Sequence, residues 1–147
     1  MPSHSESRIL PHSPEQIFDL VADVEKYPEF LPWCSAARIR SRTQNQDCTI
    51  LEADLVISFK VFREKFASKV ELRRQEGRVI TDYIDGPFKF MHSTWDVTPH
   101  PEGCAVAFSV NFEMKNVILQ KAVGIVFNEA MQRIVRAFDD RAKELYG

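Results

Sequence analysis

The chain has 147 residues, of which 44% are apolar and 27% charged, as in an ordinary single globular domain spanning residues 1–147. The net charge of −2 excludes a general basic field for nucleic acid, and we expect no DNA partner. Three widely separated cysteines (Cys34, Cys48 and Cys104) argue against a disulfide framework or a zinc site, so we expect no metal and reduced thiols in a cytoplasmic protein.

The chain opens with a predicted edge strand followed by a helix. Residues 3–10 form the strand, and Pro11 ends it. Residues 13–16 (Ser-Pro-Glu-Gln) have the spacing of a capping box, with proline at the first helical position. We expect this helix to end near Glu25, and two prolines confine residues 27–31 to a short helical turn.

Between residues 36 and 113 the hydrophobic period changes to two. Alternation of apolar and polar side chains is typical of antiparallel strands that have one face in water. Turn residues separate the alternating segments, which indicates successive hairpins. The predicted strands cover residues 38–41, 51–60, 65–72, 78–84, 91–97 and 106–113.

The last predicted element is a helix over residues 116–146. Apolar residues recur there every three or four positions, and the segment contains no proline. A helix of about 30 residues would be roughly 45 Å long. We therefore predict an α+β fold in which a curved antiparallel sheet wraps this helix, with the functional site between the two.

Three segments resemble one known family. They are residues 14–34 (PEQIFDLVADVEKYPEFLPWC), 62–70 (FREKFASKV) and 85–95 (DGPFKFMHSTW), and residues 112–114 (FEM) add a weaker match. The chain is similar to coenzyme Q-binding START-like proteins of the polyketide cyclase and lipid transport superfamily, and to the related bacterial ribosome-association toxins. This resemblance implies the helix-grip fold. Residues 92–94 (His-Ser-Thr) depart from the family, which more often has Glu-Asn-Arg there.

The resemblance also implies a function. The cavity between sheet and helix would bind ubiquinone or a related polyprenyl lipid without catalysis, with no further cofactor, in support of respiratory electron transport or quinone delivery in a bacterial cell. The protein would be cytoplasmic and peripheral at the inner membrane. Two alternatives stay open: a toxin-like protein that binds the ribosome and inhibits subunit association, and a small-molecule cyclase.

The expected cavity residues are large inward side chains of the sheet and small or flexible side chains of the last helix. Ordinary core packing is the competing interpretation for each of them. Gly124 would further lower the volume of this helix and permit a close approach or an entry. The predicted cavity residues are Phe59, Phe66, Trp95, Phe108, Phe112, Val126, Phe127, Ala130, Met131 and Ile134.

Two loops rich in aromatic residues and proline form the expected rim. Loops of this kind run over the surface, so their rings would make an exposed lip that contacts a membrane surface. The competing interpretation is that the rings fold back and plug the end of the sheet. The predicted rim residues are Tyr27, Phe30, Leu31, Trp33, Phe88, Lys89, Phe90 and Met91.

We expect no catalytic residues. The four histidines (His4, His12, His92 and His100) match no known catalytic motif, and His92 is predicted to point away from the Trp95 face. Glu52 and Asp54 are predicted to lie on the wet face of the sheet. Arg38, Arg40 and Arg42 are expected to share one face, where ribosomal RNA would be the partner in the toxin-like alternative.

Overall fold

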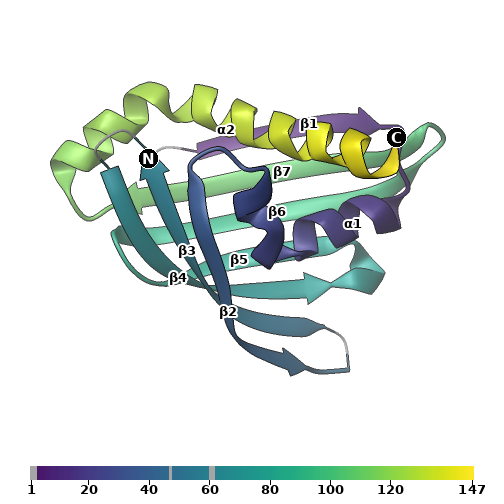
Figure 1. The fold of residues 1–147 in the computed structure, drawn as a ribbon, viewed down its shortest axis with the longest axis horizontal. Coiled ribbons are helices and arrows are strands. Elements are labelled where there is room, and N and C mark those ends of the chain that lie inside the picture. The colour runs from purple at the N-terminus through teal and green to yellow at the C-terminus, as the bar shows by residue number, and fades with distance from the viewer. Residues whose placement is uncertain (1–2, 47, 60–61) are drawn as a thin grey trace.

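The computed structural model describes residues 3–46, 48–59 and 62–147. Within these ranges seven strands form one antiparallel sheet in the order β1-β7-β6-β5-β4-β3-β2 (Figure 1). The strands are β1 (Ser3–Leu10), β2 (Cys34–Gln44), β3 (Thr49–Phe59), β4 (Phe62–Arg73), β5 (Arg78–Asp85), β6 (Phe88–His100) and β7 (Gly103–Met114). The helices are α1 (Pro14–Ala22), the 3₁₀ helices η1 (Val24–Glu29) and η2 (Arg74–Glu76), and α2 (Val117–Tyr146).

The two α-helices lie on one face of the sheet, and α2 runs lengthwise beside β1 and β7 (Figure 1). The single apolar face of the sheet and the apolar side of α2 therefore cover each other. This confirms the predicted helix-grip architecture, and β1 is an edge strand as expected. None of the helices within the described ranges is long and apolar enough to cross a membrane.

The start of α1 is as predicted, but its end is not. Ser13 Oγ accepts a hydrogen bond from the Gln16 backbone at 3.1 Å, and the Gln16 side chain accepts one from the Ser13 backbone at 3.1 Å. The helix ends at Ala22 rather than near Glu25, and the predicted short helical turn over residues 27–31 forms as η1 with earlier bounds, Val24–Glu29. Pro28 has no N–H to bond the residue 24 carbonyl, so an α-helix cannot continue through it.

A bulge in β2 corrects the prediction for the three arginines. Ile39 pairs with Ala53, but Ser41 pairs with Glu52, so Arg40 is the extra residue. One extra residue moves every later side chain to the other face of the strand. Arg42 consequently lies opposite Leu51, on the core side of the sheet, and does not share a face with Arg38. Its side chain remains exposed.

Asp54 is buried, although the sequence predicts that it faces water. Only 6% of it is exposed, although it pairs with Arg38 in register and lies on the outer face of the sheet. Arg40 Nε donates to the Asp54 carboxylate at 2.8 Å, and Lys65 Nζ lies 3.8 Å from the same oxygen. Long cationic side chains therefore cover this carboxylate on a face that alternation alone assigns to solvent.

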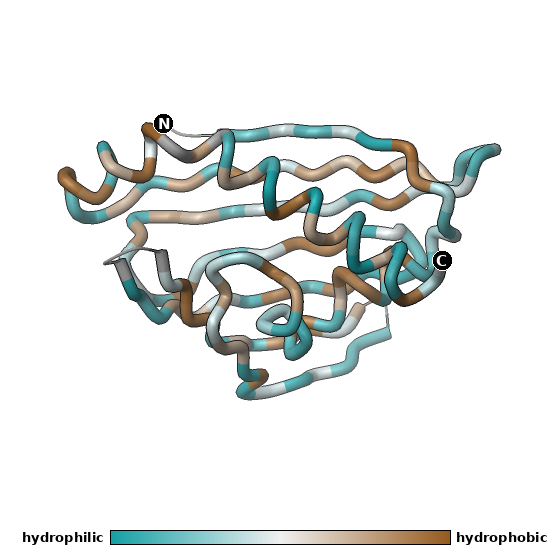
Figure 2. Tube along the Cα trace, turned by 45° about the horizontal axis from the view of Figure 1, so that its top comes forward, coloured by the Kyte–Doolittle hydropathy of each residue, from teal (hydrophilic) through white to brown (hydrophobic). Residues whose placement is uncertain are grey.

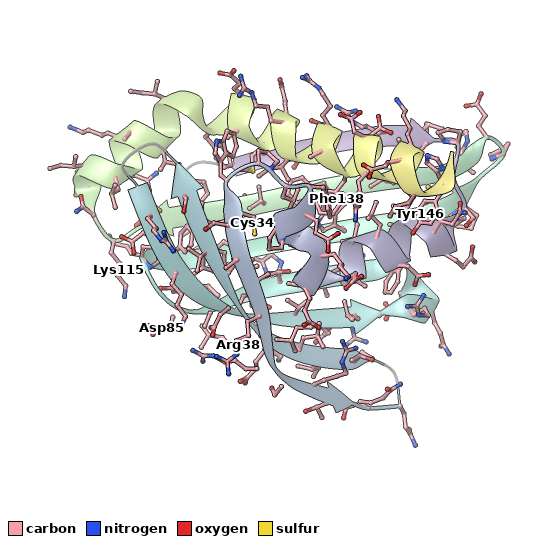
Figure 3. All side chains as sticks on the ribbon, viewed as in Figure 1. Cys34, Arg38, Asp85, Lys115, Phe138 and Tyr146 are labelled. Carbon is pink, nitrogen blue, oxygen red and sulfur yellow. The ribbon has the colours of Figure 1, made fainter. Side chains whose placement is uncertain are left out.

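The densest part of the core lies under the carboxyl-terminal half of α2. Phe138 points from the helix towards the sheet (Figure 3), with its ring 4.8 Å from that of Trp95. Tyr27 and Phe30 of the η1 region pack edge-on against the same ring at 5.5 and 5.2 Å. Ala142, one turn further, is completely buried. The sheet and the η1 region therefore both pack against this half of the helix.

Candidate functional site

A cavity of about 240 Å³ lies between the amino-terminal half of α2 and the sheet. Residues of α2 form one wall, and strands β3, β4, β6 and β7 form the rest together with the segment before β2. Its lining residues are Pro32, Trp33, Ile57, Phe66, Phe88, Met91, Val110, Phe112, Met114, Val123, Phe127, Ala130, Met131 and Ile134.

Aromatic rings in edge-to-face contact hold the sheet side of this cavity open. The Phe88 ring lies 5.4 Å from that of Phe66 and 5.8 Å from that of Phe112. Phe127 reaches down from α2 to 4.8 Å from Phe112. Rings in this geometry brace one another and do not collapse into the gap. On the helix side, the short side chain of Ala130 leaves space that a larger residue would fill.

The turn before β6 brings Phe88 into the wall. Gly86 has φ of +146°, and a Cβ on it would lie 2.6 Å from that of Phe66. Only glycine allows this close approach, because any side chain would clash with β4. The turn at residues 85–87, which the sequence predicts, therefore helps to shape the cavity.

Trp33 lines the cavity, and its backbone is in a strained conformation. It is the one non-glycine residue with positive φ (+67°) in the described part of the chain. Its carbonyl accepts a hydrogen bond from Ser58 N at 2.7 Å, which ties the segment before β2 to the end of β3. Strained residues of this kind concentrate at functional sites.

The described lining of the cavity carries no charge. None of the described lining residues is charged or a histidine. Lys89 and Glu113 form an ion pair of 3.1 Å outside it, and His92 is exposed and bound to Asp82 on the outer face, as predicted for a side chain pointing away from Trp95. Such a site can exclude water and hold an apolar group, and its described residues include no acid or base.

Two uncharged polar groups lie close to the cavity. Burial raises the pKa of the Cys34 thiol, which keeps that side chain protonated at neutral pH. The Tyr83 ring packs on Phe88 at 5.4 Å, and its buried hydroxyl has no hydrogen-bond partner among the described residues. In the same part of the chain no group of His, Cys, Asp or Glu is placed to hold a metal ion.

The structure brings most of the predicted cavity residues together. From the predicted cavity set, Phe66, Phe112, Phe127, Ala130, Met131 and Ile134 line the cavity; from the predicted rim, Trp33, Phe88 and Met91 do. The side chains of Phe59 and Val126 lie outside the described part of the structure.

Trp95 and Phe108 lie elsewhere, which corrects the expectation that they line the same groove. Their rings pack 4.5 Å apart and border a void of only about 20 Å³ near α1. They share the inward face with Phe112, but they sit further along the strands, under the carboxyl-terminal half of α2. Alternation identifies a face and not a position along it.

The aromatic lip predicted at the rim does not form. Tyr27 donates its hydroxyl proton to the Val21 carbonyl at 2.5 Å, and its ring and that of Phe30 pack on Phe138. Leu31 and Phe90 are half-buried, and only Lys89 of the predicted rim is exposed. The rings fold inwards because the core under α2 buries more apolar surface than the solvent-facing alternative.

Five lining residues were missed from the sequence: Pro32, Ile57, Val110, Met114 and Val123. Ile57 and Val110 belong to the predicted alternating sets, and Val123 lies on the predicted apolar face of the last helix, so the pattern contained their signal. Pro32 and Met114 lie at the ends of elements, where periodicity carries no information on direction.

The family model described as "Polyketide cyclase / dehydrase and lipid transport" matches residues 10–139. A protein of Rickettsia prowazekii (strain Madrid E) named ribosome association toxin RatA is 42% identical over 148 residues, covering 99% of each chain. The mitochondrial coenzyme Q-binding protein COQ10 homolog B of Xenopus laevis is 29% identical over 150 residues, covering 98% of this chain and 59% of that protein.

Two solved structures show the same fold. An 18 kDa protein from Caulobacter crescentus superposes with a TM-score of 0.84 at 28% identity, over 100% of this chain and 99% of the other. A START superfamily protein from Mycobacterium smegmatis superposes with a TM-score of 0.81 at 19% identity, over 97% and 98%.

Proposed function

Because the chain belongs to the polyketide cyclase/dehydrase and lipid transport family, we propose that it binds a polyprenyl quinone such as ubiquinone in the cavity under α2, without catalysing a reaction. The observation that carries this proposal is the lining: the described residues around about 240 Å³ are all uncharged and almost all apolar. A lipid tail gains about 25 cal/mol per Å² of apolar surface that leaves water.

The size of the cavity defines which part of the ligand it would hold. An engineered apolar cavity of about 150 Å³ binds benzene. The larger cavity here therefore suits a ring or a short stretch of isoprenoid chain, and a full tail requires the amino-terminal half of α2 to shift. A neutral quinone fits this lining better than a charged lipid, because a buried unpaired charge carries a high desolvation cost.

The name of one relative, a coenzyme Q-binding protein, supports the quinone class. The cavity itself does not favour a cyclase, since its described lining offers no carboxylate or imidazole that could act as acid or base. No cofactor beyond the bound lipid is needed for the proposed role.

A direct test is uptake of ubiquinone presented in detergent micelles, followed by gel filtration and extraction. We expect Ala130→Trp to weaken binding at least tenfold, because the indole would fill the cavity. Gln132→Trp, on the exposed face of the same helix, is the matched control and should bind as the wild type does. Equal uptake by Ala130→Trp and Gln132→Trp would reject this cavity as the binding site.

A second candidate function is ribosome binding, and the relative named ribosome association toxin favours it. The outer face of the sheet carries exposed Arg38 and Arg40, but Glu52 and Asp54 lie beside them, so the field there is mixed. The test is salt-dependent co-sedimentation with ribosomal subunits. Arg38→Glu should reduce it several-fold if this face binds RNA, whereas Arg136→Glu on the exposed side of α2 should not.

A further inference from the structure

The first turns of α2 expose large apolar side chains on the side away from the sheet. Val117, Ile118 and Ile125 are 69%, 78% and 85% exposed, values that are unusual for side chains of this kind. Ala122 is also exposed and lies between them on the same helical face. We call these four residues the apolar stripe. Figure 2 shows hydrophobic residues at this end of α2, on the left of the view.

The apolar stripe ends abruptly along the helix. One turn beyond Ile125 the same outer face carries Glu129, which accepts a hydrogen bond from Arg133 at 2.8 Å, and then Gln132 and Arg136. The carboxyl-terminal half of α2 thus has an ordinary solvated surface. A cluster of exposed aliphatic residues beside such a surface marks an interaction site.

Two lysines flank the apolar stripe. Lys115 and Lys121 are exposed at this end of the helix, and Lys115 projects away from the protein (Figure 3). No acidic residue occurs between Lys115 and Glu129 in the sequence. The amino terminus of α2 adds the positive end of its helix dipole. Lysines beside exposed aliphatic side chains on a helix complement an anionic lipid surface.

The same turns of α2 form the cavity wall on their other side. Val123 and Phe127 line the cavity, while Ile118 and Ile125 face outwards. We propose that the apolar stripe, with Lys115 and Lys121, docks this end of the protein on an anionic lipid bilayer and so sets the cavity wall against the membrane. This inference rests on the proposed function, because a lipid ligand must be exchanged with a bilayer.

The chemistry of the stripe favours lipid over RNA. Single-stranded RNA is held by stacking rings and arginines, and the stripe has neither. Aliphatic side chains gain instead from entering the boundary between headgroups and acyl chains. RNA or protein partners therefore become outcomes of the test.

The test is sedimentation with vesicles of phosphatidylcholine alone and of an equal mixture with phosphatidylglycerol. The wild type should bind the mixed vesicles more tightly, and added salt should weaken this binding. The double variant Ile118→Ser/Ile125→Ser should bind at least tenfold more weakly, and Lys121→Glu at least fivefold more weakly, on the order of the attraction of one lysine to such a surface. Leu145→Ser, a 50% exposed apolar residue at the other end of α2, is the matched control and should bind normally.

Ubiquinone uptake from detergent separates this inference from the proposed function. Unchanged vesicle binding by the double variant would overturn the docking surface even if detergent uptake is normal. Lost vesicle binding would support the docking surface even if no variant takes up quinone, in which case only the proposed function fails. If the double variant loses ribosomal subunits but retains vesicles, the stripe serves a macromolecular partner and the lipid inference is wrong.

Discussion

The two halves of α2 meet the sheet in different ways. Towards its carboxyl end the helix packs Phe138 against Trp95, and Ala142 is fully buried. Ion pairs also fix this half, since Arg141 reaches Glu29 at 2.9 Å. Towards its amino end the helix covers a cavity, and a Cβ added at Gly124 would meet no other element within 4 Å.

This contrast indicates that one helix has two roles. The carboxyl-terminal half anchors α2 to α1, η1 and the sheet, where tight packing contributes stability. The amino-terminal half has fewer packed neighbours, and it can shift to admit a ligand at a smaller cost in free energy. Stability and binding should therefore respond to mutations in different halves of the same element.

The largest expected effect is in the anchored half. Phe138→Ala should lower the free energy of unfolding by about 3–5 kcal/mol, because it empties the centre of the aromatic cluster. Chemical denaturation would measure this loss. Phe127→Ala, at the cavity, should cost less, since one side of that ring already faces open space. An equal cost for the two variants would remove the distinction between the halves.

Replacing one alanine by leucine in each half of α2 provides a second comparison of the two halves. Ala142→Leu should destabilise the protein by about 1–3 kcal/mol, because the added atoms have no room. Ala130→Leu should change the free energy of unfolding by less than about 0.5 kcal/mol, because its side chain extends into the cavity. It should nevertheless weaken lipid uptake. A large loss of stability at Ala130 would show that the cavity is not available space.

Tyr27, which packs against the carboxyl-terminal half of α2, should make the stability of the protein depend on pH. Burial, and then the nearby Cys34 and Asp23, raise the pKa of this phenol. The unfolded chain therefore loses the proton first, and the stabilisation present at neutral pH declines as the pH rises above about 10. Tyr27→Phe should cost about 1 kcal/mol at neutral pH through the lost hydrogen bond to Val21.

The difference in the free energy of unfolding between the wild type and Tyr27→Phe should become smaller in alkaline solution. There the wild type alone loses stability, because only it has this phenol to ionise. Denaturation midpoints measured from neutral pH to above about pH 10 would check it. A difference that stays constant over this range would contradict a buried, protonated Tyr27.

A gain in stability, rather than a loss, is expected at Gly124. Close approach of another element does not explain this glycine, because no described atom of another element lies within 4 Å of a Cβ added there. Gly124→Ala should raise the free energy of unfolding by up to about 1 kcal/mol through helix propensity alone. Slower lipid exchange in this variant, followed by fluorescence transfer, would indicate that flexibility at Gly124 serves ligand entry; unchanged exchange would assign it no such role.

The fold could largely be predicted from the sequence, because each element carries a local signal. The capping box around Ser13, the alternation in β3 and β7, and the helical period of α2 all act within a few residues. The bulge at Arg40 has no such signal, since it depends on how β2 pairs with β3. Strict alternation therefore predicts the wrong face for Arg42.

The site was only partly predictable for a related reason. Periodicity predicts that Trp95, Phe108 and Phe112 face the helix. Which part of α2 each of them meets depends on how the helix lies over the sheet. Tyr27 and Phe30 carry the composition of an exposed loop, and only the position of Phe138 shows why they fold inwards. Contacts between distant segments decide both cases.

Mass spectrometry of the lipid that co-purifies with the protein from a quinone-producing host is the most direct measurement. A polyprenyl quinone should be extracted from the wild type and from Gln132→Trp, and should be strongly depleted from Ala130→Trp. If the wild type carries neither quinone nor any other lipid, and takes none up from liposomes, the cavity under α2 is not a lipid site.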